Sequence, residues 1–211
     1  MEKIIAVRFF KSENGNEPVR DWLLTLDKED RKIVGADIQT VEFGFPIGMP
    51  LVKKVDTKYK LWEVRSKLAS DKISRVIFTI YKDCMILLHG FIKKDQKLPE
   101  KEKSTAIERR KKLIQENVMS NNHIGSDFND FLKEDGIYEE TNDIAIKRVI
   151  AYQLEQEMKA QKVTKTKMAE MMKTSRAVVN RLLNPDNSSL TLNTLESAAH
   201  ALGKRLNISI A

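Results

Sequence analysis

Apolar and polar residues alternate along three runs in the first half of the chain, and this period of two predicts β-strands. In residues 60–68, Trp62, Val64 and Leu68 share one face, and charged residues occupy the intervening positions. Residues 73–81 alternate in the same way, and residues 85–92 form the third run. Short polar turns separate the runs, so the pattern predicts an antiparallel meander of three strands.

Helical spacing flanks the predicted meander. Residues 4–10 predict a further strand, and apolar residues at i, i+3, i+4 and i+7 predict helices over residues 18–26 and 27–44. Pro99 precedes another helical stretch, which reaches about Gln115. The order is strand, helix, helix, three strands, helix, and it predicts an α+β domain with helices against an antiparallel sheet.

The last third of the chain has mainly helical spacing. Residues 144–161 carry one apolar stripe, and Thr164 and Ser175 are suited to cap two short helices that follow. A further helix is expected over residues 192–202, and residues 206–210 alternate like a short strand. Two short helices joined by a tight turn are typical of a helix-turn-helix, so an all-α helix-turn-helix domain is expected here.

Charge divides the chain at the same places. The 211 residues include 37 Lys and Arg against 30 Asp and Glu, a net charge of +7. Residues 1–118 are basic, with 25 basic and 18 acidic side chains; residues 119–143 hold one basic and seven acidic side chains; residues 144–211 hold 11 basic and five acidic ones. We therefore predict three parts, 1–118, 119–143 and 144–211.

The middle part, residues 119–143, is called the acidic segment below. Charged linkers are common, so one interpretation is a solvated connection between domains. Phe128, Phe131 and Leu132 favour the other interpretation, in which the segment docks on a basic surface. It starts with Met-Ser-Asn-Asn, which resembles the beginning of a second protein.

Several classes of protein are not expected from this composition. Apolar runs such as residues 85–88 are too short to cross a bilayer, and no signal peptide is expected at the N-terminus. One cysteine cannot form an internal disulfide, and the three histidines lie too far apart for a helical metal motif. We expect a cytoplasmic protein without a metal or cofactor.

Cations are the remaining candidates for chemistry in the first part. Arg65 and Arg75 lie on neighbouring predicted strands and can share a face, and Lys93 lies at the end of the third strand. Lys53 and Lys54 would enter from the loop after residue 44, and Lys94 and Lys97 follow Lys93. Such a cluster binds phosphate and can stabilise a pentacoordinate transition state. The alternative is a solvated basic face of the sheet.

The ordered motifs of the first part resemble the RelE/HigB toxin superfamily, and in particular its phage-derived HigB-type branch. They are Leu-Trp-Glu-Val-Arg at residues 61–65, Ser-Arg-Val-Ile-Phe at 74–78, and Leu-Leu-His-Gly-Phe-Ile-Lys-Lys at 87–94, followed by Pro99 and a basic helix. The resemblance implies a ribosome-dependent endoribonuclease that needs no metal. In such toxins the ribose 2′-hydroxyl attacks the adjacent phosphate of mRNA in the ribosomal A site and gives a 2′,3′-cyclic product.

The resemblance also implies roles for individual residues. Catalytic roles, which orient and neutralise the scissile phosphate, fall to Arg65, Arg75, Lys93 and Lys94. Tyr81 and His89 are candidates for the general base, although a histidine such as His89 is more often a packed strand residue. Contacts to RNA are expected from Lys53, Lys54, Lys97, Arg109 and Arg110.

Residues 163–183 resemble the Cro/repressor-type (XRE) DNA-binding family, and the following helix resembles that of HigA-type antitoxins. Lys173 stands where that family commonly has Gly, so the turn would require Lys in a left-handed conformation. Thr164, Lys165 and Lys167 would hold phosphates, and bases would be contacted by Ser175, Arg176, Asn180 and Arg181. A helical protein-interaction module is the alternative.

A toxin-like part followed by an antitoxin-like part predicts a toxin–antitoxin fusion. Its expected partners are the ribosome and mRNA for the first part and operator DNA for the last, which would repress its own operon as a homodimer; no membrane is expected. The acidic segment is expected to help neutralise the basic site, by contact within or between chains. The alternative is a transcriptional regulator whose first domain is catalytically inactive.

Overall fold

The computed structural model describes residues 1–69, 71–93, 99–115, 123–184 and 190–207. The chain divides into two compact units. The first unit is Lys3–Asn142, and the second is Asp143–Ala211 together with the first two residues. The division therefore falls at the end of the acidic segment, whose described residues up to Asn142 belong to the first unit.

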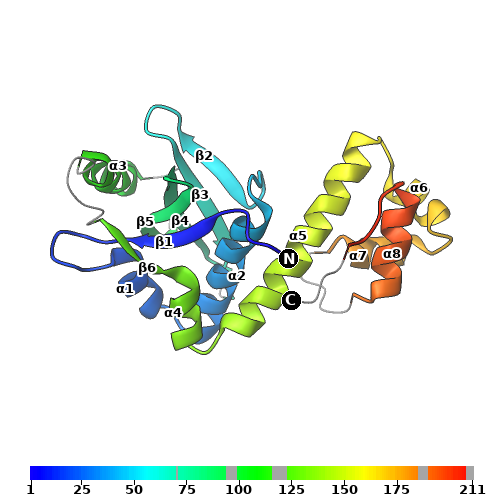
Figure 1. The fold of residues 1–211 in the computed structure, drawn as a ribbon, viewed down its shortest axis with the longest axis horizontal. Helices are drawn as coiled ribbons and strands as arrows, with labels where there is room; N and C mark the ends of the chain where they lie inside the picture. Colours follow the sequence, from blue (N-terminus) through cyan, green and yellow to red (C-terminus); the bar gives the residue numbers. More distant parts are fainter. Residues whose placement is uncertain (70, 94–98, 116–122, 185–189, 208–211) are drawn as a thin grey trace. The chain divides into compact units, whose positions relative to one another are not determined.

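The first unit is built on a six-stranded sheet in the order β2-β3-β4-β5-β1-β6 (Figure 1). Its strands are β1 (Ala6–Phe10), β2 (Val52–Asp56), β3 (Leu61–Lys67), β4 (Ile73–Tyr81), β5 (Cys84–Lys93) and β6 (Ile124–Asp127). The expected meander is confirmed, because β4 pairs antiparallel with both β3 and β5. Lys82 and Asp83 have φ of 47° and 56°, as a two-residue hairpin loop with the right-handed twist of its strands requires.

Helices cover both faces of this sheet. One face, the α2 face, packs against α1 (Pro18–Leu24), α2 (Lys28–Gly44) and α4 (Phe128–Glu134), and its core includes Val64, Val76 and Phe78. The other face, the α3 face, packs against α3 (Glu100–Gln115) through Ile77, Phe91 and Leu113, among others. Figure 1 shows α3 on one side of the strands and α1, α2 and α4 on the other.

The acidic segment completes the first unit. Its strand β6 pairs antiparallel with β1, and its helix α4 buries Phe128 and Phe131 against Phe9, with ring centroids 5.6 Å apart in both pairs. The backbone N–H and the hydroxyl of Ser126 at the β6 edge donate to the Glu17 carboxylate. The segment is therefore docked, as its aromatic residues favoured, and it supplies an edge strand and part of the core.

A bulge in β5 changes which of its side chains lie on each face. Ile77 pairs with His89 but Phe78 pairs with Leu87, so Leu88 is the extra residue. Leu87 packs in the core of the α2 face, whereas Phe91, four residues later, packs in that of the α3 face. The bulge thus shifts the alternation of β5 by one residue.

The second unit is helical. It holds most of α5 (Tyr138–Ala160), together with α6 (Lys165–Met171), α7 (Arg176–Leu182) and α8 (Leu192–Ala201). Its core includes Met158, Met168, Val179, Leu182 and Leu195. The expected caps are confirmed, because the side chains of Thr164 and Ser175 accept from the backbone N–H groups of Lys167 and Val178.

The structure corrects several expected boundaries. Lys53 and Lys54 lie on the edge strand β2 and not in a loop. Helix α5 begins at Tyr138, before the expected residue 144, because Ile137 and Tyr138 pack on the core of the first unit. Residues 206–207 form no strand, and the rest of the expected terminal strand lies outside the described residues, as do residues 119–122. In the described parts of the chain, no helix has both the length and the apolar character needed to span a membrane.

Candidate functional site

Two arginines lie side by side on the α3 face of the sheet. Arg65 on β3 is the direct cross-strand partner of Arg75 on β4, as the alternation of both strands predicted. Like charges directly opposite each other destabilise a sheet unless a counter-charge is present. That counter-charge is Glu63, which is 1% exposed and lies on the same face of β3.

Glu63 binds the two arginines unequally. Arg75 Nη1 donates to both carboxylate oxygens, at 2.7 Å to Oε1 and 2.6 Å to Oε2. Arg65 Nε lies 3.9 Å from Oε1, and Arg65 Nη1 lies 3.7 Å from the Met49 sulfur. Arg75 is therefore fixed by a buried ion pair, whereas Arg65 is held more loosely and is about a quarter exposed.

Lys93 and Lys53 complete a group of four cations on this face, called the cation cluster below. Lys93 pairs with Ile73 at the end of β5, and the bulge at Leu88 turns it to the α3 face. Burial lowers the pKa of Lys93, and the neighbouring Arg75, Arg65 and Lys53 lower it further. Lys53 pairs with Glu63 across the edge of the sheet and is exposed.

Two hydrogen-bond donors of the cluster have no partner among the described residues. Within the described part of the chain, the Nε groups of Arg65 and Arg75 are buried without a hydrogen-bond partner. An unpaired buried N–H costs free energy, and a bound oxyanion would recover it. Arg75, Arg65 and Lys53 also contribute to the lowered pKa of Lys93, so these cations repel one another. A shared anion would reduce this repulsion.

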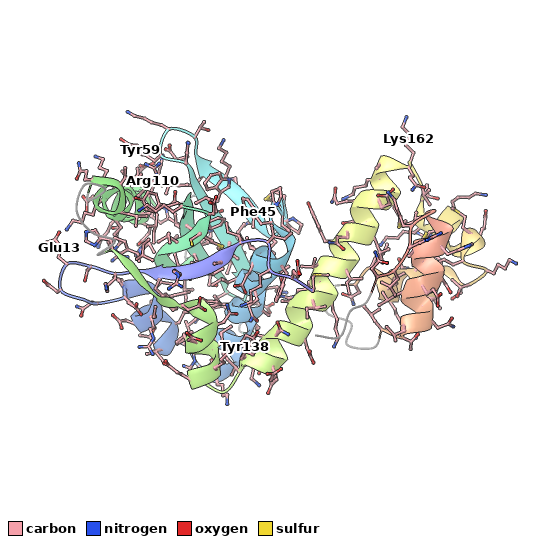
Figure 2. All side chains as sticks on the ribbon, viewed as in Figure 1. Glu13, Phe45, Tyr59, Arg110, Tyr138 and Lys162 are labelled. Atoms are coloured by element: carbon pink, nitrogen blue, oxygen red, sulfur yellow. The ribbon has the colours of Figure 1, made fainter. Side chains whose placement is uncertain are left out.

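The other residues predicted to bind RNA do not lie together in the structure. Lys54 pairs with Trp62 and so lies on the α2 face, away from the cluster. Lys94 and Lys97 lie outside the described residues. The two arginines of α3 reach the sheet: Arg109 donates to the Leu88 carbonyl at 2.7 Å, and Arg110, which is labelled in Figure 2, donates to the Thr79 hydroxyl at 3.3 Å.

His89 is on the cluster's face of the sheet, but both of its ring nitrogens are in use. Nε2 contacts Glu102, and Nδ1 lies 3.1 Å from Nη1 of Arg109. Burial lowers the pKa of His89, and Arg109 lowers it further, although Glu102 acts in the opposite direction. A neutral ring that donates from Nε2 and accepts at Nδ1 satisfies both partners, so His89 fastens α3 to the sheet.

Tyr81 is placed far from the arginines. It lies on β4 six residues after Arg75, which is about 20 Å along a strand. The ammonium of Lys82 lies 5.4 Å from its ring centroid. Neither candidate for the general base therefore presents a free basic atom beside the cation cluster.

The described residues of the acidic segment within the first unit, 123–142, lie away from the cation cluster. Its aromatic side chains belong to the core of the α2 face, on the other side of the sheet. Its carboxylates pair with helices of that side: Glu134 with Arg20, Asp135 with Arg31 at 3.0 Å, and Glu140 with Lys32. Within one chain, the described residues of the segment are anchored on the α2 face by their apolar side chains, and neutralisation of the basic site by contact between chains stays a prediction.

A second polar surface lies on α6 and α7 of the second unit. The residues predicted to contact DNA are all exposed there: Thr164, Lys165, Lys167, Ser175, Arg176, Asn180 and Arg181. Lys167 Nζ contacts Glu170 at 3.1 Å. Lys173 has φ of 51°, so the turn between the helices does require the left-handed conformation that its position predicted.

Within the described ranges, no group of three or more His, Cys, Asp or Glu side chains could hold a metal ion.

Residues 21–111 match the family model described as "Phage derived protein Gp49-like (DUF891)", a family related to RelE/HigB-type toxins. The match includes all four residues of the cation cluster and ends before the acidic segment. No curated protein matches the chain.

Proposed function

We propose that the first unit is a toxin-type endoribonuclease that cleaves mRNA on the ribosome at the cation cluster. The observation that carries the proposal is the cross-strand pair Arg65 and Arg75, whose Nε groups are buried without a partner in the described structure. The match to a toxin-related family over the same residues supports it. A group of cations with unused donors suits a substrate with a phosphodiester oxyanion.

In the proposed reaction, the ribose 2′-oxygen loses its proton and attacks the adjacent phosphorus. The O2′–P bond forms, the P–O5′ bond breaks, and the 5′-oxygen takes a proton, which gives a 2′,3′-cyclic phosphate and a 5′-hydroxyl. Negative charge grows on the non-bridging oxygens in the transition state. Arg65, Arg75 and Lys93 would stabilise this charge and hold the phosphate in line.

No side chain of the described residues stands beside the cluster as an evident general base. We therefore propose that the cations contribute most of the catalysis by stabilising the transition-state charge, and that water or the RNA itself accepts the 2′ proton. Burial and the neighbouring cations lower the pKa of Lys93, and an approaching phosphate would act in the opposite direction, because its negative charge favours the ammonium form.

We propose that the second unit binds operator DNA through α6 and α7. Two capped short helices, a left-handed turn residue and exposed side chains on α7 support a helix-turn-helix reading. In this arrangement Arg176 and Asn180 would contact base edges in the major groove, and Lys165 would contact phosphate. A homodimer would then bind half-sites about 34 Å apart.

In the proposed fusion, the antitoxin role belongs to the second unit, acting on its own chain or on a neighbouring one. The acidic segment has a structural role, because it pairs with β1 and fills the core of the α2 face. A regulator with an inactive first unit is the competing function, and binding to the ribosome without cleavage is a third.

Cleavage of mRNA on programmed ribosomes tests the proposal. We would compare the full chain with residues 1–142, because the compact unit ends at Asn142. Arg65→Ala is the appropriate inactive variant, since Arg75 keeps its ion pair with Glu63 when Arg65 is removed. Lys54→Ala is the matched control, because Lys54 lies on the other face of the sheet.

Each outcome selects one function. Cleavage by residues 1–142 that Arg65→Ala abolishes and Lys54→Ala preserves supports a toxin. Weaker cleavage by the full chain would add support for neutralisation by the second unit. Ribosome binding without cleavage in both proteins refutes the nuclease, and the absence of both activities favours the regulator.

A further inference from the structure

Glu63 is a buried carboxylate at the centre of the cation cluster. It is 1% exposed, and its neighbours on the α3 face include the apolar Leu61 and Ile77. Burying a charge costs free energy unless it is paired and hydrogen-bonded. A glutamate buried at this point of the sheet therefore requires the cations around it. Its contacts also show how it restrains the side chains of those cations.

Both oxygens of Glu63 are bound to a single nitrogen of Arg75. This arrangement occupies Nη1 of the guanidinium and leaves Nε without a partner among the described residues. Nε of Arg65 faces the same carboxylate from 3.9 Å, too far for a hydrogen bond. Glu63 thus restrains two adjacent guanidinium groups, and the buried Nε of each has no partner among the described residues.

The same contacts exclude Glu63 as the base of the reaction. A general base must reach the proton that it removes, within hydrogen-bond distance or through one water. Glu63 is almost wholly buried, and both of its oxygens already accept from Arg75. Its remaining effect on a bound phosphate is indirect, through the position and mutual repulsion of Arg65 and Arg75.

We propose that Glu63 is a positioning residue, which holds the guanidinium groups of Arg65 and Arg75 side by side for one phosphate of an RNA strand. This inference rests on the proposed function only for the identity of the polyanion. Positioning by Glu63 and simple electrostatics predict opposite changes in RNA affinity when Glu63 is removed. Glu63 is a negative charge beside a phosphate site, so electrostatics alone predicts that its removal tightens RNA binding.

Equilibrium binding of a 2′-O-methyl RNA oligonucleotide to the full chain tests the proposal. This probe cannot be cleaved at its 2′ positions, so the measurement is valid whether or not the protein is a nuclease. We would compare the wild type with Glu63→Gln, and use Glu29→Gln as the control. Glu29 is exposed on α2, on the other side of the sheet, and its variant changes the net charge by the same amount.

We expect Glu63→Gln to weaken RNA binding by about 10- to 100-fold, the range expected for losing hydrogen bonds to a charged group. Glu29→Gln should bind as the wild type does, or slightly more tightly. Where cleavage is measurable, Glu63→Gln should lower kcat more than it raises KM. Binding by Glu63→Gln that equals or exceeds that of Glu29→Gln would overturn the proposal.

A loss of folding must be separated from a loss of positioning. Trp22 and Trp62 both lie in the first unit, so tryptophan fluorescence reports whether that unit is folded in each variant. If Glu63→Gln does not fold, Glu63→Asp replaces it, since this variant keeps the charge and shortens the side chain by one methylene. A folded Glu63→Asp that binds RNA as tightly as the wild type would also overturn the proposal.

Discussion

The structure predicts that the acidic segment is held by its apolar side chains and not by its charge. Phe131→Ala tests the apolar contribution. The Phe131 ring is 3% exposed, packs edge-on against Phe9 with centroids 5.6 Å apart, and lies 5.6 Å below the Arg20 guanidinium. Removing a phenylalanine from a packed core costs about 3 to 5 kcal/mol, because the cavity collapses only in part.

The charge contribution is tested by Glu134→Gln combined with Glu140→Gln. Glu134 pairs with Arg20 through a side chain that is 62% exposed, and Glu140 pairs with Lys32 through a side chain that is 60% exposed. Surface ion pairs of this kind contribute about 0 to 1 kcal/mol each and are screened by salt. The double variant should therefore cost less than Phe131→Ala and should lose its effect in about 1 M salt.

Urea unfolding followed by tryptophan fluorescence measures both variants in the full chain. Trp22 and Trp62 are the two tryptophans of the sequence, so the signal follows the first unit. We expect a clearly lower midpoint for Phe131→Ala at every salt concentration. A double charge variant that is destabilised as much as Phe131→Ala would refute this reasoning and restore an electrostatic docking of the segment.

Three further predictions follow from single contacts. Gly90→Ala should destabilise the first unit by about 1 to 3 kcal/mol in the same urea assay, because an added Cβ would lie 2.2 Å from Cε3 of Trp22. Lys173→Gly should stabilise the second unit by about 0.5 to 1 kcal/mol, measured by circular dichroism, because φ of 51° favours glycine; a loss of stability would contradict this. His89 has a pKa below its ordinary value of 6.5, so the unfolded state takes up its proton first and stability falls as the pH decreases below about 6.5. His89→Gln should flatten that dependence between pH 7 and pH 5 in the same urea assay, and an unaltered dependence would contradict this.

Much of the first unit could be predicted because its strands alternate cleanly. The period of two in β3 and β4 places Arg65 and Arg75 on one face, and this placement gives the centre of the candidate site. Asp27 caps α2 by accepting from the Asp30 N–H at 2.8 Å, and aspartate is a residue type preferred at that position. In both cases the position of the side chain depends on residues close to it in the sequence, so the local sequence pattern is enough to predict it.

The remaining features depend on contacts that no local pattern contains. The bulge at Leu88 lies within a continuous apolar run, where alternation cannot be read, yet it decides that Lys93 joins the cluster. Arg109 and Arg110 look like a basic surface in the sequence, but the sheet beneath α3 offers them carbonyl and hydroxyl acceptors. Strand β6 is short and is fixed by pairing with β1, a long-range contact that its own residues do not indicate.

The chemistry of the cut end of an mRNA held on programmed ribosomes decides most directly whether the cation cluster cleaves RNA. With residues 1–142, we expect a 2′,3′-cyclic phosphate at the cut and no cleavage where the attacking ribose is 2′-deoxy. We also expect no product with Arg65→Ala and normal product with Lys54→Ala. Cleavage that survives either the 2′-deoxy substitution or the removal of Arg65 would show that the cluster does not act by this reaction.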